Sequence, residues 1–161
     1  MILGIDLSNI RGGGGITHIS EVLKHAMPID FGFKKVIAWG SSNTLSSLCN
    51  QAWLEKVHTP VLDGILPQRI WWQQLVLPKL LKEHGCDLLF SPGGTLPRRV
   101  SVAAVTMSQN LLPFEPKEAA RYEAVSMRTR FKLLNIAQSM SFQRADGLIF
   151  LTEYAKKTVF A

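Results

Sequence analysis

Short apolar runs alternate along the chain with longer segments in which apolar residues recur at helical spacing. An uninterrupted apolar run is typical of a buried strand, and apolar residues three or four positions apart indicate one face of a helix. Strands are predicted at 2–7, 34–39, 87–90, 100–107 and 146–151, with a poorer one at 57–61, and helices at 16–25, 44–53, 68–84, 117–145 and from 152 onward.

This alternation predicts an α/β fold, with a Rossmann-like, doubly wound and mainly parallel sheet that carries helices on both faces. The poorer strand at 57–61 is expected at a sheet edge or a strand end, because Pro60 cannot donate a ladder hydrogen bond. The 161 residues suffice for one domain with a real core.

In the helix predicted at 68–84, mainly apolar residues recur at helical spacing: Ile70, Trp71, Gln74, Leu75, Leu77, Leu80 and Leu81. Trp71 shares helical spacing with Ile70 and Leu75, which favours a core position over a sugar-stacking platform or a membrane contact. Pro78 is expected to kink or break this helix, because proline lacks the N–H that an interior position needs.

A glycine-rich loop follows the first strand. Arg11 and then four glycines, Gly12 to Gly15, stand immediately before the first helix. Glycine lets a ligand approach the backbone closely, and a helix N-terminus favours a phosphate or another anion. A dinucleotide fingerprint fails, since its last glycine would fall on Thr17 or His18, and no Gly-Lys-Ser/Thr triplet follows. The alternative is a merely tight turn, but four glycines cost more entropy than a turn requires.

Two further polar segments follow predicted strands, at Ser91–Thr95 and Ser108–Asn110. Open α/β sheets bind ligands at the carboxyl ends of their strands, so these segments and the glycine loop are expected to meet on one rim. His18 lies in the first helical turn beside the glycines, where it is either a site residue or an ordinary packed histidine. This rim is the predicted ligand site.

Composition narrows the class of ligand. Hydrophobic residues make up 47% of the chain and charged residues 19%, which is typical of a soluble globular protein. The net charge of +6 favours a phosphorylated substrate or an anionic membrane surface over nucleic acid, because the basic residues are dispersed. The segment 121–132, with three arginines and Lys132, is either a membrane-facing surface or a solvated basic helix face.

The cysteines and histidines suggest no metal and no disulfide. Cys49 and Cys86 lack C-x-x-C spacing, which fits reduced thiols in a cytoplasmic protein. His25, His58 and His84 have no partners at metal-ligand spacing. Asp6 interrupts the first apolar run, so no signal peptide is visible, and no run is long enough to span a membrane.

The chain resembles the N-terminal half of family-four retaining glycosyltransferases, which have the two-domain GT-B fold. The similar segments occur in the family's order and cover nearly the whole chain. They are 12–18 (GGGGITH), 69–78 (RIWWQQLVLP), 87–94 (DLLFSPGG), 109–115 (QNLLPFE) and 144–155 (RADGLIFLTEYA). Many members have His-Asp where this chain has Gln109-Asn110, so hydrogen bonding to sugar hydroxyls replaces an imidazole role there.

The resemblance implies that residues 1–161 form the acceptor-binding domain, with a C-terminal nucleotide-sugar domain outside this chain. The helix that begins near Thr152 and stops at Ala161 is likewise expected to continue in a longer protein. The implied donor substrate is a nucleotide sugar, with no cofactor and no metal, and the acceptor is a sugar or a lipid-linked sugar. Contacts to the donor diphosphate or the acceptor are expected from Gly13, Gly14, Gly15, His18, Gly93, Gly94, Thr95, Gln109 and Asn110.

The expected role is polysaccharide biosynthesis in the cytoplasm, with peripheral contact to the inner face of the membrane. No catalytic residue is assigned. Two other functions remain open: a self-contained binding module for a phosphorylated small molecule, and one half of a sugar-nucleotide epimerase of the same architecture.

Overall fold

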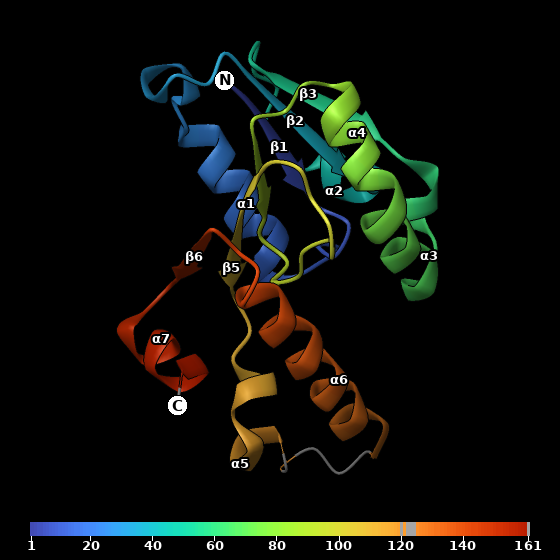
Figure 1. The fold of residues 1–161 in the computed structure, drawn as a ribbon, viewed down its shortest axis with the longest axis vertical. Helices are drawn as coiled ribbons and strands as arrows, with labels where there is room; N and C mark the ends of the chain where they lie inside the picture. The colour runs from blue at the N-terminus through green and yellow to red at the C-terminus, as the bar shows by residue number, and fades with distance from the viewer. Residues whose placement is uncertain (120, 122–124, 161) are drawn as a thin grey trace.

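A parallel sheet forms the centre of the protein (Figure 1). The computed structural model describes residues 1–119, 121 and 125–160. Within them the sheet has six strands in the order β3-β2-β1-β4-β5-β6, and every neighbouring pair is parallel. The strands are β1 (Ile2–Asp6), β2 (Lys35–Gly40), β3 (Leu54–His58), β4 (Leu88–Ser91), β5 (Ala103–Ser108) and β6 (Gly147–Phe150). The predicted Rossmann-like, doubly wound α/β fold is confirmed.

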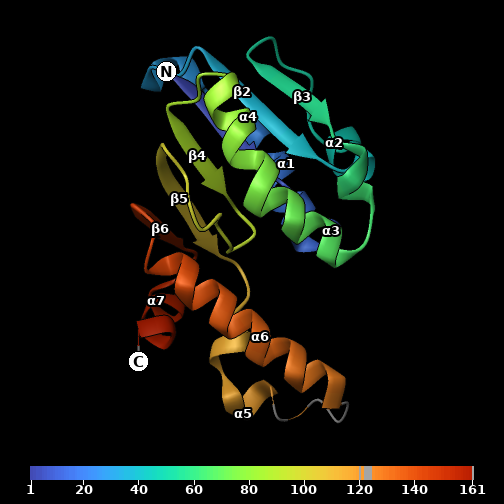
Figure 2. The same cartoon turned by 45° about the vertical axis from the view of Figure 1, so that its right-hand side comes forward.

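Helices cover both faces of the sheet. They are α1 (Gly14–His25), α2 (Ser42–Ser46), α3 (Leu66–Trp71), α4 (Leu77–Glu83), α5 (Pro116–Ala119), α6 (Val125–Phe142) and α7 (Glu153–Phe160). Short 3-10 turns lie at Pro28–Phe31, Pro60–Asp63 and Leu112–Phe114. Figure 2 shows α3 and α4 in front of the sheet and α1 behind it, while α5 and the first turns of α6 project beyond the carboxyl ends of the strands.

The alternation of side chains along β2 separates two core layers. Val36 and Ala38 point to the layer formed with α1 and α2, and Ile37 and Trp39 point to the layer formed with α4. All four are essentially inaccessible to solvent. Burial on both faces explains why this strand reads as an almost uninterrupted apolar run in the sequence.

Two predicted boundaries are wrong around the edge strand. The strand predicted at 57–61 is β3, three residues earlier, and Pro60 opens a 3-10 turn beyond it. β3 does lie at the sheet edge, as expected from that proline. The helix predicted at 44–53 ends at Ser46, because the Trp53 carbonyl accepts a hydrogen bond from the Val36 N–H (2.8 Å) and the chain there already follows the sheet.

The predicted core position of Trp71 is also wrong. Trp71 is 53% exposed, whereas its neighbour Trp72 is 1% exposed and packs with Leu77 and Leu81. A π-helical turn at Trp72–Val76 separates α3 from α4, immediately before Pro78. The wide turn inserts one extra residue and rotates the buried stripe, so simple helical spacing selects the wrong tryptophan. The helix does not break at Pro78, which lies in the first turn of α4, and the departure from regular helix geometry is the π-helical turn that ends at Val76.

The two thiols are expected to differ strongly in reactivity. Both cysteines are free, and burial together with the nearby Asp87 raises the pKa of Cys86 to about 11. Only a thiolate attacks a disulfide reagent, and at pH 8 a thiol of this pKa is ionised to roughly one part in a thousand. Ellman's reagent should therefore modify half-buried Cys49 well before Cys86, with the rate at Cys86 rising as the pH approaches 11. Equal native rates would contradict this, and unfolding in urea should equalise them.

Candidate functional site

The glycine loop lies at the point where the strand order reverses. The chain leaves β1 toward β2 on one side and leaves β4 toward β5 on the other, while β1 and β4 are paired neighbours. Loops that diverge in this way open a crevice at the carboxyl ends of the strands. The two loops are held together, since the Asn9 side-chain amide donates to the Thr95 hydroxyl (3.0 Å).

The second half of the glycine loop belongs to the start of helix α1 and is not a turn. Gly13 is the N-cap of α1, with φ at 63° in the left-handed region, and Gly14 and Gly15 are the first helical residues. The N–H groups of Gly14 and Gly15 precede the first intrahelical acceptor, so the helix itself gives them no partner. A Cβ at position 12, 13 or 14 would meet no protein atom within 4 Å, so this stretch of backbone is open to a ligand.

A buried hydrogen-bond network fixes the rim beneath the loop. Asp6, at the end of β1, is 1% exposed and accepts from the Ser8 N–H (2.9 Å), the Gln73 amide (2.5 Å) and the Ser91 hydroxyl (3.2 Å). The Gln73 amide and the Ser91 hydroxyl also donate to the Thr95 carbonyl, at 3.2 and 2.8 Å. One carboxylate thus joins β1, the π-helical turn and the loop after β4.

Cations gather beside the network. The Arg69 guanidinium donates to the Ser8 carbonyl (3.1 Å), and Arg11 donates to the Gly64 and Asp63 carbonyls (2.9 and 3.1 Å). Desolvation lowers the pKa of Arg69, and repulsion from Arg11 and Arg130 lowers it further. Within the described residues none of these three arginines forms a salt bridge, although Arg11 lies near the Asp63 carboxylate. Together they bring positive charge, which attracts anions, to a rim that also holds the buried Asp6 carboxylate.

Several buried polar atoms at this rim have no hydrogen-bond partner among the described residues. They are Ser8 Oγ, His18 Nδ1, Arg69 Nε, Ser108 Oγ and Gln138 Oε1. Ser8, Ser108 and Gln138 are each no more than 3% exposed. A buried polar atom without a partner costs about 1–3 kcal/mol, so the rim is less well satisfied by hydrogen bonds than an ordinary protein interior.

The structure brings several of the predicted site residues together. A Cβ on Gly15 would lie 3.3 Å from Gln109 Oε1, and a Cβ on Gly93 would lie 3.1 Å from that of Asn9. The ends of β1, β4 and β5 therefore meet as expected. Thr95 faces Asn9 and Gln73 rather than solvent.

Other predicted residues have structural roles that are evident in the fold. Gly94 has φ at 79°, and a Cβ there would lie 2.4 Å from the Gln138 amide nitrogen, so it permits the close approach of α6. The Asn110 carboxamide accepts from the Leu112 N–H (3.1 Å) and shapes the loop after β5. His18 is half-buried in α1.

Four residues that sequence patterns did not assign to the site hold the rim together: Asp6, Asn9, Arg69 and Gln73. A signal did exist for two of them. Asp6 is a carboxylate at the end of an apolar strand, and Gln73 is an amide inside a largely apolar helix. Polar side chains in such positions need buried partners, and these two turn out to be partners of each other.

Neither a metal centre nor a membrane span is found within the described residues. No three histidine, cysteine, aspartate or glutamate side chains gather there as metal ligands, and no helix combines the length and apolar character needed to cross a bilayer. The candidate site is therefore an anion-attracting rim built from backbone N–H groups, arginines and amides. Comparisons with protein-family models, with curated proteins and with solved structures gave no match to this chain.

Proposed function

We propose that this chain is the N-terminal, acceptor-side half of a sugar-nucleotide-dependent retaining glycosyltransferase. The observation that carries the proposal is the open, glycine-rich start of α1 at the switch point, beside Arg11 and Arg69, whose hydrogen bonds go to backbone carbonyls. A diphosphate fits such a place, because helix N-terminal N–H groups and guanidinium groups both bind phosphate oxygens. The similarity of five ordered segments to the family supports the same assignment.

In this proposal the rim acts on the leaving group. Transfer breaks the bond between the anomeric carbon and a phosphate oxygen, and the acceptor oxygen bonds to that carbon as its proton leaves with the diphosphate. Negative charge grows on the diphosphate, where the N–H groups of Gly14 and Gly15 and the Arg69 guanidinium stabilise it. Gln109 donates or accepts hydrogen bonds with sugar hydroxyls, while the C-terminal half supplies most of the nucleotide contacts.

The proposed acceptor is a sugar or a lipid-linked sugar, and the latter implies peripheral contact with a membrane. Exposed apolar side chains on α3 and the following turn suit that contact: Ile70, Trp71 and Leu75 are between 45% and 56% exposed. Tryptophan is favoured at the boundary between lipid and water. The proposal places the protein in the cytoplasm, at the inner face of the membrane.

The test compares the 161-residue chain with the complete protein, using a panel of radiolabelled nucleotide sugars and extracted lipid-linked acceptors. The complete protein should transfer sugar with retention, and the chain alone should not. A nucleoside diphosphate alone should bind the chain with a Kd only in the millimolar range, a binding free energy of roughly −4 kcal/mol, as expected for half a site.

Two outcomes favour other functions. Micromolar binding of a phosphorylated molecule by the chain, with no transfer by the complete protein, would support the stand-alone binding module. Inversion at a sugar carbon of the nucleotide sugar, without transfer, would support the epimerase. Transfer by the isolated chain would contradict the two-domain proposal itself.

A further inference from the structure

The helical layer over the sheet has a gap between α4 and α6. The connection from β4 to β5 is a loop at 92–102 without a helix, although parallel strands are usually joined by one. Figure 2 shows β4 and β5 without a covering helix between α4 and α6. In its place lies a cavity of about 660 Å³, lined by residues 96–103 together with Arg144 and Asp146.

The cavity continues into a smaller one of about 330 Å³ beside α4. The two share Arg99, Val100 and Ser101 in their walls, and the smaller one adds Lys79 and Lys82. Together they form one cleft, named here the loop cleft, that lies on the face of the sheet. It reaches the first residue of β5, Ala103, at the end of that strand opposite to the glycine-loop rim. The larger cavity alone, at about 660 Å³, lies within the size range of small-molecule sites.

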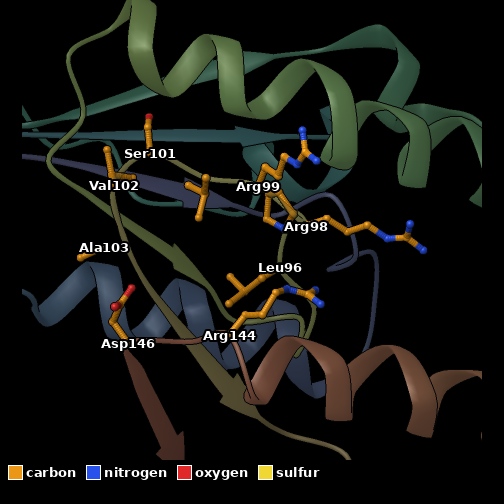
Figure 3. Close-up of a pocket in the computed structure, with 10 residues that line it drawn as sticks. Leu96, Arg98, Arg99, Ser101, Val102, Ala103, Arg144 and Asp146 are labelled. Carbon is orange, nitrogen blue, oxygen red and sulfur yellow. The ribbon is translucent and has the colours of Figure 1, made fainter.

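The loop cleft is strongly cationic. Its walls carry Arg98, Arg99, Arg144, Lys79 and Lys82, and none of these side chains has an ion pair or a hydrogen bond within the described part of the chain. Asp146 is the carboxylate that lines it, and one of its oxygens accepts from the Ala104 N–H (2.8 Å). Figure 3 shows Asp146 at the end opposite to the guanidinium groups of Arg98, Arg99 and Arg144.

The backbone that carries two of these arginines is held in place. The Leu96 N–H donates to the Ser141 hydroxyl of α6 (3.0 Å), and the Leu96 carbonyl accepts from the Gln74 amide (3.3 Å). The same Gln74 side chain accepts from the Arg98 N–H (2.9 Å). The loop is therefore fastened to α6 and to the π-helical turn, which reduces the ordering cost of binding at Arg98 and Arg99.

We propose that the loop cleft is a second binding site, specific for an anion that carries phosphate groups. Guanidinium groups bind phosphate through paired hydrogen bonds, and two lysines add point charges that a multiply charged ligand compensates. The site is separate from the glycine-loop rim and does not depend on the proposed transferase activity. Its phosphate belongs either to a soluble phosphorylated molecule or to a lipid headgroup.

The test titrates inorganic pyrophosphate into the isotope-labelled chain and follows the backbone amide signals of Val100, Ser101 and Val102 by NMR. These signals should shift saturably, and the double variant Arg98→Gln/Arg99→Gln should weaken binding at least tenfold. The matched control Lys24→Gln/Lys34→Gln removes the same charge from exposed positions outside the cleft and should change the affinity less than twofold. Arg69→Gln alters the rim and should leave the pyrophosphate-induced shifts of Val100, Ser101 and Val102 unchanged. The proposal for the cleft can therefore be contradicted without contradicting the proposal for the rim, and the reverse also holds.

A second arm identifies the source of the phosphate. Vesicles that contain phosphatidylglycerol are sedimented with the parent chain, the cleft double variant and the lysine control in the absence of pyrophosphate. If sedimentation requires Arg98 and Arg99 and pyrophosphate causes no shifts, the site binds a lipid headgroup. If pyrophosphate causes the shifts and the chain does not sediment with vesicles, the site binds a soluble ligand. No shift at about 10 mM pyrophosphate together with no sedimentation overturns the proposal. Equal losses in the cleft variant and the lysine control also overturn it.

Discussion

Replacing Gly14 by alanine in the complete protein is expected to lower kcat/KM about a hundredfold while leaving Tm unchanged or slightly higher. Gly14 is the first residue of α1, and a Cβ there would meet no protein atom within 4 Å. The protein therefore tolerates the methyl group, and alanine is a better helix former than glycine. The space that the methyl group takes is the space through which a diphosphate reaches the N–H groups of Gly14 and Gly15.

Gly12→Ala is the matched control for this experiment. A Cβ at Gly12 also meets nothing within 4 Å, but the residue precedes the N-cap and offers no N–H group at the helix start. Activity should stay close to that of the parent. Turnover and melting curves are measured on the same preparations of all three proteins. Normal turnover in Gly14→Ala would remove the glycine loop from the site, whatever the Tm.

Replacing Asp6 by alanine is expected to lower the free energy of unfolding by about 2–6 kcal/mol, because each buried donor that loses the carboxylate costs about 1–3 kcal/mol. The carboxylate accepts three hydrogen bonds and Asp6 is only 1% exposed. Its loss therefore leaves the Ser8 N–H and one N–H of the Gln73 amide without an acceptor and shielded from water. The midpoint of urea unfolding should fall accordingly. For a chain of this size Tm should fall by about 10 °C.

Asp30→Ala is the control for Asp6, because Asp30 is an exposed carboxylate in a 3-10 turn far from the network. It should change the free energy of unfolding by less than about 0.5 kcal/mol, as surface substitutions usually do. If Asp6→Ala is no more destabilising than Asp30→Ala, the network does not stabilise the rim. Cysteine reactivity at position 86 offers a second readout, since loosening of the sheet exposes that thiol.

Sequence patterns were sufficient for the strands, the parallel sheet and the meeting of three loops at one rim, because each of these follows from local periodicity and a general rule of α/β topology. They were insufficient where a contact joins distant residues. The Asp6–Gln73 hydrogen bond spans 67 positions, and no local pattern pairs the two. The prediction of which side of the helix at 66–83 is buried failed for another reason. Apolar residues lie on both the exposed and the buried sides of this helix, so the side that is buried depends on the π-helical turn.

The loop cleft could not be predicted from the sequence for a related reason. The cleft exists because the β4–β5 connection contains no helix to cover this part of the sheet. Its walls come from α4, that loop and the residues after α6. Each arginine taken singly looks like an ordinary surface residue in the sequence. Only the packing of the helices on both sides of the loop brings the charges together.

The central position of β1 has a consequence for how the protein is made. β1 is synthesised first, yet one of its two sheet partners, β4, starts at Leu88, and Leu3 pairs with Leu88 itself. At ribosomal speeds of about 5–20 residues per second, the missing partner arrives roughly 4–17 s after β1. During that interval one edge of β1 is unpaired, and transiently unpaired strand edges of this kind are prone to aggregation unless chaperones protect them. The order of strands that builds the rim therefore also sets when the newborn chain most needs protection.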